Sequence, residues 1–507
     1  MSNLNKDILI YIFEELSDNQ KSLHSCLLVN RFWCETVVPI LWSDVWKFFE
    51  DPDESENISK RMMEKYKSLF KIILLYLPKK SSNFLVNQNI EIISTQEKPL
   101  FNYLSYIKSI KLSHIYIFAN EILGFDNIGE TSYQLFAFEQ ELFKLFMNNC
   151  SKLNYLDMFY STHHLKHQLH IFPGAENCLS RLCELRCNAR NDSSFFYGLA
   201  QICDSINKFI IEDLIDNPGL ARLIKVQKKI QVIDFDHQSD EDDDESFLQD
   251  DLRRIGTALK FHAINLRVFS LDFCSKNFFI SSILENSINL QKLALSKNLP
   301  NERINENIII RNPCCPKLHT LLLYFVSISL AIKLVERIQG NLIKIGIYFV
   351  SYDIENTGNF IKTIYQNCLN IEYVTIIMKN CDFDELEILL IKCQHLKGII
   401  FESIYEGEDI NMVNGNKLLN LLIEKSPKNL YKIGFYFNWK FDYNSLDLFF
   451  NNWKGRKSLL LETGEKNNFL LNYPGLIEKY ESNGVIKNYK HQDELWNSVY
   501  IKTVLDL

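Results

Sequence analysis

The chain has 507 residues, of which 47% are hydrophobic and 23% charged, a composition that is typical of a folded protein. It is too long for one ordinary hydrophobic core, since such cores stop growing near ~250–300 residues. Its net charge of −8 offers nucleic acid no attraction, and its apolar run 320–332 is shorter than the ~18 residues of a membrane span. Its 13 cysteines include no CxxC pair and predict reduced thiols in a cytosolic or nuclear compartment, without a disulfide framework or a zinc site.

The first 42 residues predict three short helices. Apolar residues recur at helical spacing on one face of the first helix, at Ile8, Leu9, Ile12, Phe13 and Leu16. Ser22 is a candidate cap for a second helix that carries Leu23, Leu27 and Leu28. The third helix is expected to end before Pro39, after Phe32, Trp33, Val37 and Val38. A bundle this small supplies little core of its own, so we expect it to pack on something else.

These segments resemble an F-box. The family's opening pattern LPxE[IL]LxxIFxxL is followed by an LVxxxW-like segment and a closing LW, and all three occur here in order, except that Asn5 replaces the usual proline. The resemblance implies that residues 1–48 dock on a Skp-type adaptor of a cullin-RING ubiquitin ligase. The residues implied to bind the adaptor are Leu4, Asp7, Ile8, Leu9, Ile12, Leu16, Leu28, Val29, Trp33, Leu41 and Trp42. The alternative is a helical cap for the domain that follows.

Residues 49–100 predict a linker and a helical N-terminal cap. Glu50–Asn57 is acidic and contains a proline, which is typical of a solvated linker. A helix is expected over Met62–Leu77, where it covers the open end of the next domain.

A repeat then runs through the chain at intervals of mostly 24 to 29 residues. Each unit has an apolar anchor followed by apolar residues three and five positions on, as in "LHTLLL" from Leu318. The twelve anchors are Ile107, Leu153, Leu182, Ile206, Ile230, Leu266, Leu290, Leu318, Leu342, Ile371, Leu396 and Leu430. The period-two residues predict a short strand, and segments such as Asp384–Leu396 and Ser327–Gly340 predict helices between strands. Fixed periods of this length indicate a solenoid.

The unit resembles the cysteine-containing leucine-rich repeat, whose helix ends in a CPxLxxLxL-like motif matched from Cys315 to Leu323. The fold class is therefore expected to be α/β, a horseshoe-shaped leucine-rich-repeat solenoid of about 12 strand-helix repeats over residues 101–460. Residues 461–507 are expected to form a C-terminal cap. Four further cysteines lie three residues before their anchors, at Cys150, Cys203, Cys368 and Cys393, and are expected to be small buried side chains.

Positions that alternate with the core residues of each strand face the inner side of such a solenoid and are the natural surface for a partner. They are acidic in the middle repeats and include tyrosines later, beside Lys292, Lys344 and Lys432. The predicted substrate-binding residues are Glu212, Asp234, Asp236, Asp272, Tyr324, Tyr348, Glu402 and Tyr436. We expect a ligand with basic residues near the middle repeats and apolar anchors near the later ones. The alternative is that the tyrosines stack on one another along the sheet.

Other signals predict no chemistry. The acidic run Asp236–Phe247 is expected to be a solvated loop, and His163, His167 and His170 a surface loop rather than a metal site. No Walker, GxGxxG, HExxH or GxSxG motif occurs, so we expect no enzyme and no cofactor. The predicted function is substrate recognition for an SCF-type ubiquitin ligase, with no nucleic-acid or membrane partner. The alternative is a leucine-rich-repeat scaffold without a ligase role.

Overall fold

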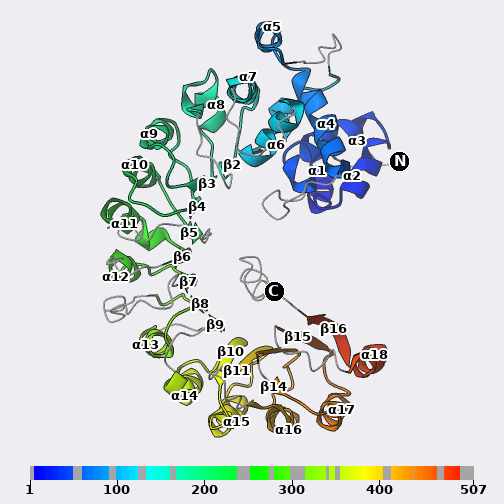
Figure 1. Cartoon of the computed structure of the whole chain (residues 1–507), viewed down its shortest axis with the longest axis vertical. Coiled ribbons are helices and arrows are strands. Elements are labelled where there is room, and N and C mark those ends of the chain that lie inside the picture. Colours follow the sequence, from blue (N-terminus) through cyan, green and yellow to red (C-terminus); the bar gives the residue numbers. More distant parts are fainter. Residues whose placement is uncertain are drawn as a thin grey trace. The chain divides into compact units, whose positions relative to one another are not determined.

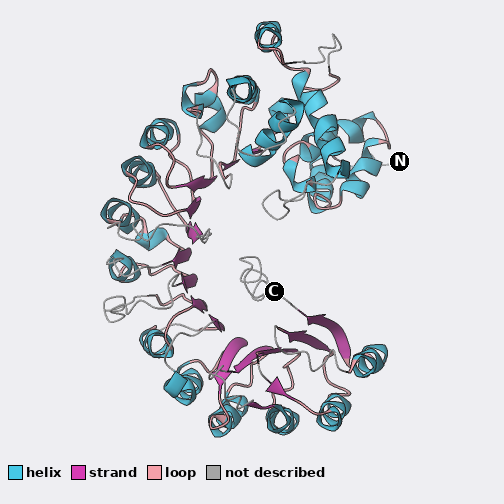
Figure 2. Ribbon diagram, in the orientation of Figure 1, coloured by secondary structure: helices cyan, strands magenta, loops and turns pink. Residues whose placement is uncertain are grey.

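The computed structural model describes residues 5–49, 60–90, 99–123, 133–159, 167–236, 252–272, 279–296, 315–338, 342–348, 354–403, 413–437, 439–464 and 473–491. The chain divides into two compact units, Met1–His262 and Ala263–Leu507. From α7 to α18 the helices lie on one side of the strands of their unit, whereas α1–α4 form a group at the β1 end (Figures 1 and 2). We call the opposite side of the strands the inner face.

The first unit begins with helices and continues as a parallel sheet in the order β1-β2-β3-β4-β5. Its strands are β1 (Ser109–Lys111), β2 (Tyr155–Asp157), β3 (Glu184–Asn188), β4 (Lys208–Glu212) and β5 (Val232–Asp236). Its α-helices are α1 (Lys6–Glu15), α2 (Gln20–Leu27), α3 (Arg31–Leu41), α4 (Lys60–Leu74), α5 (Lys79–Asn87), α6 (Leu112–Leu123), α7 (Tyr133–Asn149), α8 (Ala175–Leu179), α9 (Ser193–Ile202), α10 (Pro218–Val226) and α11 (Arg253–Lys260). Its short 3₁₀ helices include η1 (Trp46–Phe48), η3 (Tyr103–Tyr106) and η4 (Leu169–Ile171).

The second unit is a parallel sheet in the order β6-β7-β8-β9-β10-β11-β13-β15-β16. These strands are β6 (Val268–Asp272), β7 (Lys292–Ser296), β8 (Thr320–Tyr324), β9 (Lys344–Tyr348), β10 (Tyr373–Met378), β11 (Gly398–Ser403), β13 (Lys432–Tyr436), β15 (Leu459–Thr463) and β16 (Ile486–His491), and a separate pair joins β12 (Val413–Asn414) to β14 (Trp439–Lys440). The helices are η6 (Ala263–Asn265), α12 (Phe279–Leu284), α13 (Ile328–Arg337), η8 (Ile354–Asn356), α14 (Thr357–Asn367), α15 (Phe383–Lys392), α16 (Gly415–Lys425), α17 (Tyr443–Asn452) and α18 (Pro474–Ser482).

The predicted pattern is confirmed in all twelve repeats. Each of the twelve anchors is at most 1% exposed, and a strand begins two residues after each of them. The structure is therefore a leucine-rich-repeat solenoid in which the anchor and the two following apolar positions fill the space between strand and helix. Strands β15 and β16 extend the sheet beyond the twelve predicted anchors.

The cysteines that precede the anchors are buried, as predicted. Cys150, Cys203, Cys315, Cys368 and Cys393 are buried and free. The Cys203 thiol lies 3.2 Å from the carbonyl oxygen of Leu179 in the preceding repeat, in position to donate to it. Burial raises the pKa of Cys203 to about 12, so the thiol stays protonated and acts as a small core side chain.

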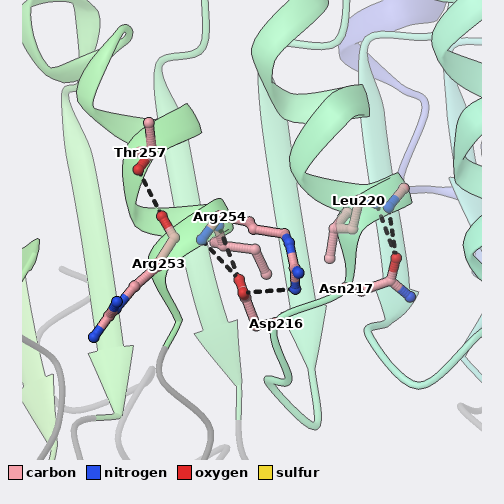
Figure 3. A network of polar contacts seen from close by, with 8 residues as sticks. Asp216, Asn217, Leu220, Arg253, Arg254 and Thr257 are labelled. Atoms are coloured by element: carbon pink, nitrogen blue, oxygen red, sulfur yellow. Dashed lines mark hydrogen bonds and ion pairs between the residues drawn. The ribbon is translucent and has the colours of Figure 1, made fainter.

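Neighbouring repeats are joined where their helices begin (Figure 3). Asn217 accepts from the amides of Gly219 and Leu220 at 2.9 and 3.1 Å, which caps α10, and its amide group donates to the carbonyls of Ala189 and Asn191. A β-carbon at Gly219 would lie 2.1 Å from a carbonyl oxygen at the start of α9, so glycine permits this close approach. These bonds fix α10 against the preceding repeat.

The first turn of α11 is held in the same way. Asp216 accepts from the amides of Arg254 and Ile255 at 3.0 and 3.1 Å, and its second oxygen lies 3.3 Å from the Arg254 guanidinium (Figure 3). A carboxylate at a helix N-terminus satisfies amides that have no partner within the helix.

Candidate functional site

The helices α1, α2 and α3 form a bundle around one small core. Leu9, Phe13, Leu23 and Val37 are its fully buried members. Three asparagines cap the helices: Asn5 accepts from the amide of Asp7 at 3.4 Å, Asn19 from Ser22 at 3.0 Å, and Asn30 from Trp33 at 2.9 Å. The expected cap Ser22 therefore lies inside α2, and α3 continues past Pro39 to Leu41. Asn5, which replaces the usual proline, has a capping role of its own.

The bundle exposes large apolar side chains that its core does not use. Tyr11 is 72% exposed and Leu28 is 80% exposed, so most of each side chain faces solvent. The set, which we call the bundle's apolar surface, comprises Ile8, Tyr11 and Ile12 of α1 together with Leu28, Val29 and Phe32 around the α2–α3 connection.

Only part of the predicted adaptor-binding set belongs to this surface. Ile8, Ile12, Leu28 and Val29 are exposed, as is Asp7 in the first turn of α1. Leu9 was also expected to be available for docking, and this is wrong: it is 1% exposed because it forms the bundle core. Leu16, Trp33 and Leu41 pack against that core, Trp42 stacks on Tyr103, and Leu4 lies outside the described residues.

Sequence reasoning missed Tyr11 and Phe32. Tyr11 follows Ile8 by three positions and so shares its face of α1, a signal that was present in the sequence. Phe32 was named only as a residue of the third helix, and it is 43% exposed.

The bundle is joined to the first repeat by specific contacts. The indole Nε1 of Trp46 donates to the carbonyl of Ser109 in β1 at 2.8 Å, and its ring stacks on His114 of α6 at 5.2 Å. The Ser109 hydroxyl donates to Asp44 at 2.7 Å. Tyr66 of α4 is hydrogen-bonded to the same His114. The bundle therefore has a fixed position on the β1 end of the sheet.

The inner face of the first unit carries a buried ion network. Arg186 of β3 lies 2.7 Å from Glu212 of β4 and 3.6 Å from Asp157 of β2, and Tyr155 donates to Asp157 at 2.8 Å. Glu212 is 1% exposed and Asp157 is 3% exposed. Burial raises the pKa of Asp157 in spite of the nearby Arg186.

This network reduces the negative charge of the surface that was predicted to bind a basic ligand. Glu212 had been expected to offer free negative charge to a basic ligand, but Arg186 already neutralises it. Asp234 is partly exposed within β5. Asp236 and Asp272 end the strands β5 and β6. Arg186, at an earlier inner-face position of β3, was not among the predicted residues.

The tyrosines of the second unit lie against the sheet. Tyr324 and Tyr348 stack with ring centroids 5.2 Å apart and are 4% and 2% exposed, and Tyr436 is 1% exposed. A β-carbon at Gly346 would lie 2.8 Å from the Tyr348 ring, and one at Gly464 would lie 2.0 Å from the Tyr436 ring. Small residues thus make room for flat rings, which supports the stacking alternative over exposed aromatic anchors.

The neighbouring strands carry two buried charged residues, Lys432 and Glu402, and the partly buried Glu462. Lys432 of β13 is 3.1 Å from Glu462 of β15. Glu402 of β11 is 5% exposed, and burial raises its pKa to about 8. Among the other inner-face lysines, Lys344 lies over the ring of Tyr373 at 5.2 Å, and Lys292 of β7 is partly exposed.

The histidines and the acidic run that the sequence analysis singled out are either packed in the fold or lie outside the described residues. His167 is buried, bonds to Glu139 at 3.0 Å and stacks on Phe136, so the expectation of a surface loop is wrong for it. His163 and most of the acidic run, residues 237–247, lie outside the described residues. Searching the described part of the chain finds no group of three His, Cys, Asp or Glu residues suited to a metal ion. None of its helices is both long and apolar enough to cross a bilayer.

The sequence matches no protein-family model and no curated protein. Among solved structures, it is similar to the complex of Rad7 and Elc1 from yeast, with 14% identity over 62% of this chain and 76% of that chain and a TM-score of 0.39. It is also similar to the leucine-rich repeat-containing protein LegL7 from Legionella pneumophila, with 12% identity over 61% of this chain and 88% of that chain and a TM-score of 0.36.

Proposed function

We propose that this protein is the substrate-recognition subunit of an SCF-type ubiquitin ligase. The observation that carries the proposal is the bundle's apolar surface on a segment that resembles an F-box. Exposed large apolar groups on a domain with a complete small core mark a site for another protein. A Skp-type adaptor is the partner that the F-box resemblance implies.

The receptor itself would catalyse nothing. Its repeats would hold a substrate while the adaptor and cullin bring a ubiquitin-charged enzyme nearby, which raises the local concentration of the reacting groups. The contacts of Trp46 and Ser109 support this role because they fix the bundle on the repeats. A fixed contact between the bundle and the repeats would keep the distance between adaptor and substrate constant.

The same contact between the bundle and the repeats also favours a second candidate function, a leucine-rich-repeat scaffold whose bundle only caps the sheet. Trp46 is fully buried beside β1, the terminal strand of the order in its unit. A cap would require this packing but not the exposed residues of α1. The two functions therefore differ in whether substitutions at the apolar surface change an interaction.

The test is co-purification of the full chain with a Skp-type adaptor, using Ile8→Lys and Leu28→Lys. Both side chains are exposed, so the bundle should fold, whereas an unpaired ammonium in a buried interface costs several kcal/mol, about 3–5. The matched control is Ile391→Lys on α15, because Ile391 is 50% exposed and Ile8 is 49% exposed.

We expect the wild type and the Ile391→Lys control to bind the adaptor, and the two bundle variants to lose it with unchanged circular dichroism. A folded wild type that binds no Skp-type adaptor would leave the scaffold function. Equal binding by all four proteins would show that the apolar surface is not the docking site.

A further inference from the structure

Four cations gather on one edge of the second unit, where the chain leaves α16 and α17 and enters β13 and β15. Lys428 lies between α16 and β13, and Lys454, Arg456 and Lys457 lie between α17 and β15. We call this group the basic edge. The three lysines are exposed, and none of the four side chains has an ion pair within the described part of the chain. A chain whose net charge is −8 thus keeps several positive charges together without acidic partners.

Hydrogen bonds join the two loops of the basic edge. The Arg456 guanidinium donates from Nη1 to the hydroxyl of Ser426 at 2.8 Å and from Nη2 to the carbonyl of Pro427, the residue before Lys428. Its central carbon lies 3.9 Å from the centroid of the Trp453 ring. These contacts hold the loop after α17 against the loop after α16, so the cations of both loops belong to one surface.

The ammonium of Lys457 stands on an aromatic ring. It lies 3.3 Å from the ring centroid of Tyr431, whose hydroxyl is hydrogen-bonded to that of Tyr373 at 3.0 Å. A ring face attracts a cation but carries no net charge. Lys457 is therefore held in place while its positive charge stays available to an anion.

Acidic residues of the neighbouring helices do not neutralise the basic edge. Glu387 pairs with Lys425 at 2.8 Å, and Asp447 of α17 pairs with Lys479 at 2.7 Å. Glu424 is exposed in the last turn of α16. Even with Glu424 counted, four cations against one acid leave a surplus of three positive charges.

The first unit shows how a repeat neutralises a lysine at this position. Lys228 lies two residues before its anchor and pairs at 2.7 Å with Asp204, which lies two residues before the anchor of the preceding repeat. Lys428 also lies two residues before its anchor, but the corresponding residue of its preceding repeat is Gln394. An amide carries no charge, so Lys428 lacks the carboxylate that Lys228 has.

The arrangement of the cations selects the kind of anion. Both terminal nitrogens of Arg456 are bonded to protein oxygens, so this guanidinium is not free for the bidentate grip that is typical of a phosphate site. Trp453 is buried and the Tyr431 ring carries Lys457, so neither ring is an open platform on which a nucleic-acid base could stack. Single ammonium groups spread over two loops suit carboxylates spaced along a peptide.

We propose that the basic edge binds an acidic segment of a partner protein, whose carboxylates pair with Lys428, Lys454 and Lys457. That this partner is a ligase substrate rests on the proposed function, but the binding of an acidic segment does not.

The experiment is a fluorescence-anisotropy titration of the full chain into dye-labelled hexaglutamate at about 50 mM salt. Hexaglutamine is the uncharged probe, and hexathymidylate is the nucleic-acid probe. Lys428→Gln/Lys457→Gln removes two charges from the basic edge. The matched control is Lys228→Gln/Lys229→Gln, which removes two exposed lysines from the corresponding place of a repeat in the first unit.

An exposed charge pair changes an affinity by up to about 5-fold, so we expect Lys428→Gln/Lys457→Gln to bind hexaglutamate about 10-fold more weakly than the wild type. The control should stay within about 2-fold of the wild type. Binding should also weaken as the salt rises from about 50 to about 500 mM. All these side chains are exposed, so circular dichroism should be unchanged in both variants.

Four results would overturn the proposal: no binding of hexaglutamate by the folded wild type, equal binding of hexaglutamine, equal losses in the two variants, or tighter binding of hexathymidylate. The last result would indicate a nucleic-acid partner instead. Adaptor binding should be unchanged in both variants, so its failure in the wild type would count against the proposed function alone.

Discussion

Replacing Arg186 with methionine tests whether the inner face of the first unit is held by its ion network. Methionine keeps the length of the side chain but removes the charge from between Glu212 at 2.7 Å and Asp157 at 3.6 Å. The three side chains are only 17%, 2% and 5% exposed, so solvent compensates little. Removing one partner of a buried pair costs about 3–5 kcal/mol, because the remaining charge is left without compensation.

The loss should depend on pH. Burial already raises the pKa of Asp157, and without the arginine the raised value should increase further. A carboxyl group whose pKa is higher in the folded state stabilises the fold below its unfolded pKa, and this contribution is lost as the pH rises through the folded value. The deficit of Arg186→Met should therefore be larger at about pH 7.5 than at about pH 5.

Urea unfolding followed by circular dichroism at both pH values measures this. The control is Arg31→Met, which breaks an exposed pair with Glu35 at 2.8 Å and should leave the unfolding midpoint unchanged. The double variant Arg186→Met/Glu212→Gln should recover part of the lost stability. A deficit below about 1 kcal/mol, or one independent of pH, would refute the view that the network is buried and uncompensated.

Three further predictions concern packing and reactivity. Leu9→Ala should destabilise the N-terminal bundle by about 2–5 kcal/mol through the cavity it leaves, seen as earlier loss of helix in thermal unfolding. Gly464→Ala should lower the melting temperature because its β-carbon would overlap the tyrosine ring above it, whereas Gly475→Ala, with open space around it, should not. In native peptide mapping at about pH 8, iodoacetamide should alkylate the exposed Cys381 and spare Cys203, whose buried thiol has a pKa of about 12.

Twelve strands could be predicted because each follows an apolar anchor and carries apolar residues three and five positions after it. Strands β15 and β16 were missed for a physical reason: the positions two residues before them are Lys457 and Gly484, so neither has an apolar anchor. Their place in the sheet depends instead on parallel pairing with a strand already formed. Pairing of this kind is not visible in a local pattern.

The N-terminal surface was only half predictable. Apolar residues at positions 8, 9, 12, 13 and 16 cover two adjoining faces of α1, and the sequence does not say which of them packs inward. The structure buries Leu9 and Phe13 and leaves Ile8 and Ile12 in solvent. The choice is made by α2 and α3, whose side chains complete the core.

The inner face shows why charge at a site cannot be inferred from one strand. Glu212 and Glu402 occupy the same position of their repeats, six residues after the anchors Ile206 and Leu396, and both are buried. The first is neutralised by an arginine 26 residues earlier in the chain, while the second has a threonine in that place. The same position of two repeats therefore differs in charge, because the residue that neutralises the glutamate comes from the neighbouring strand and not from the repeat that carries it.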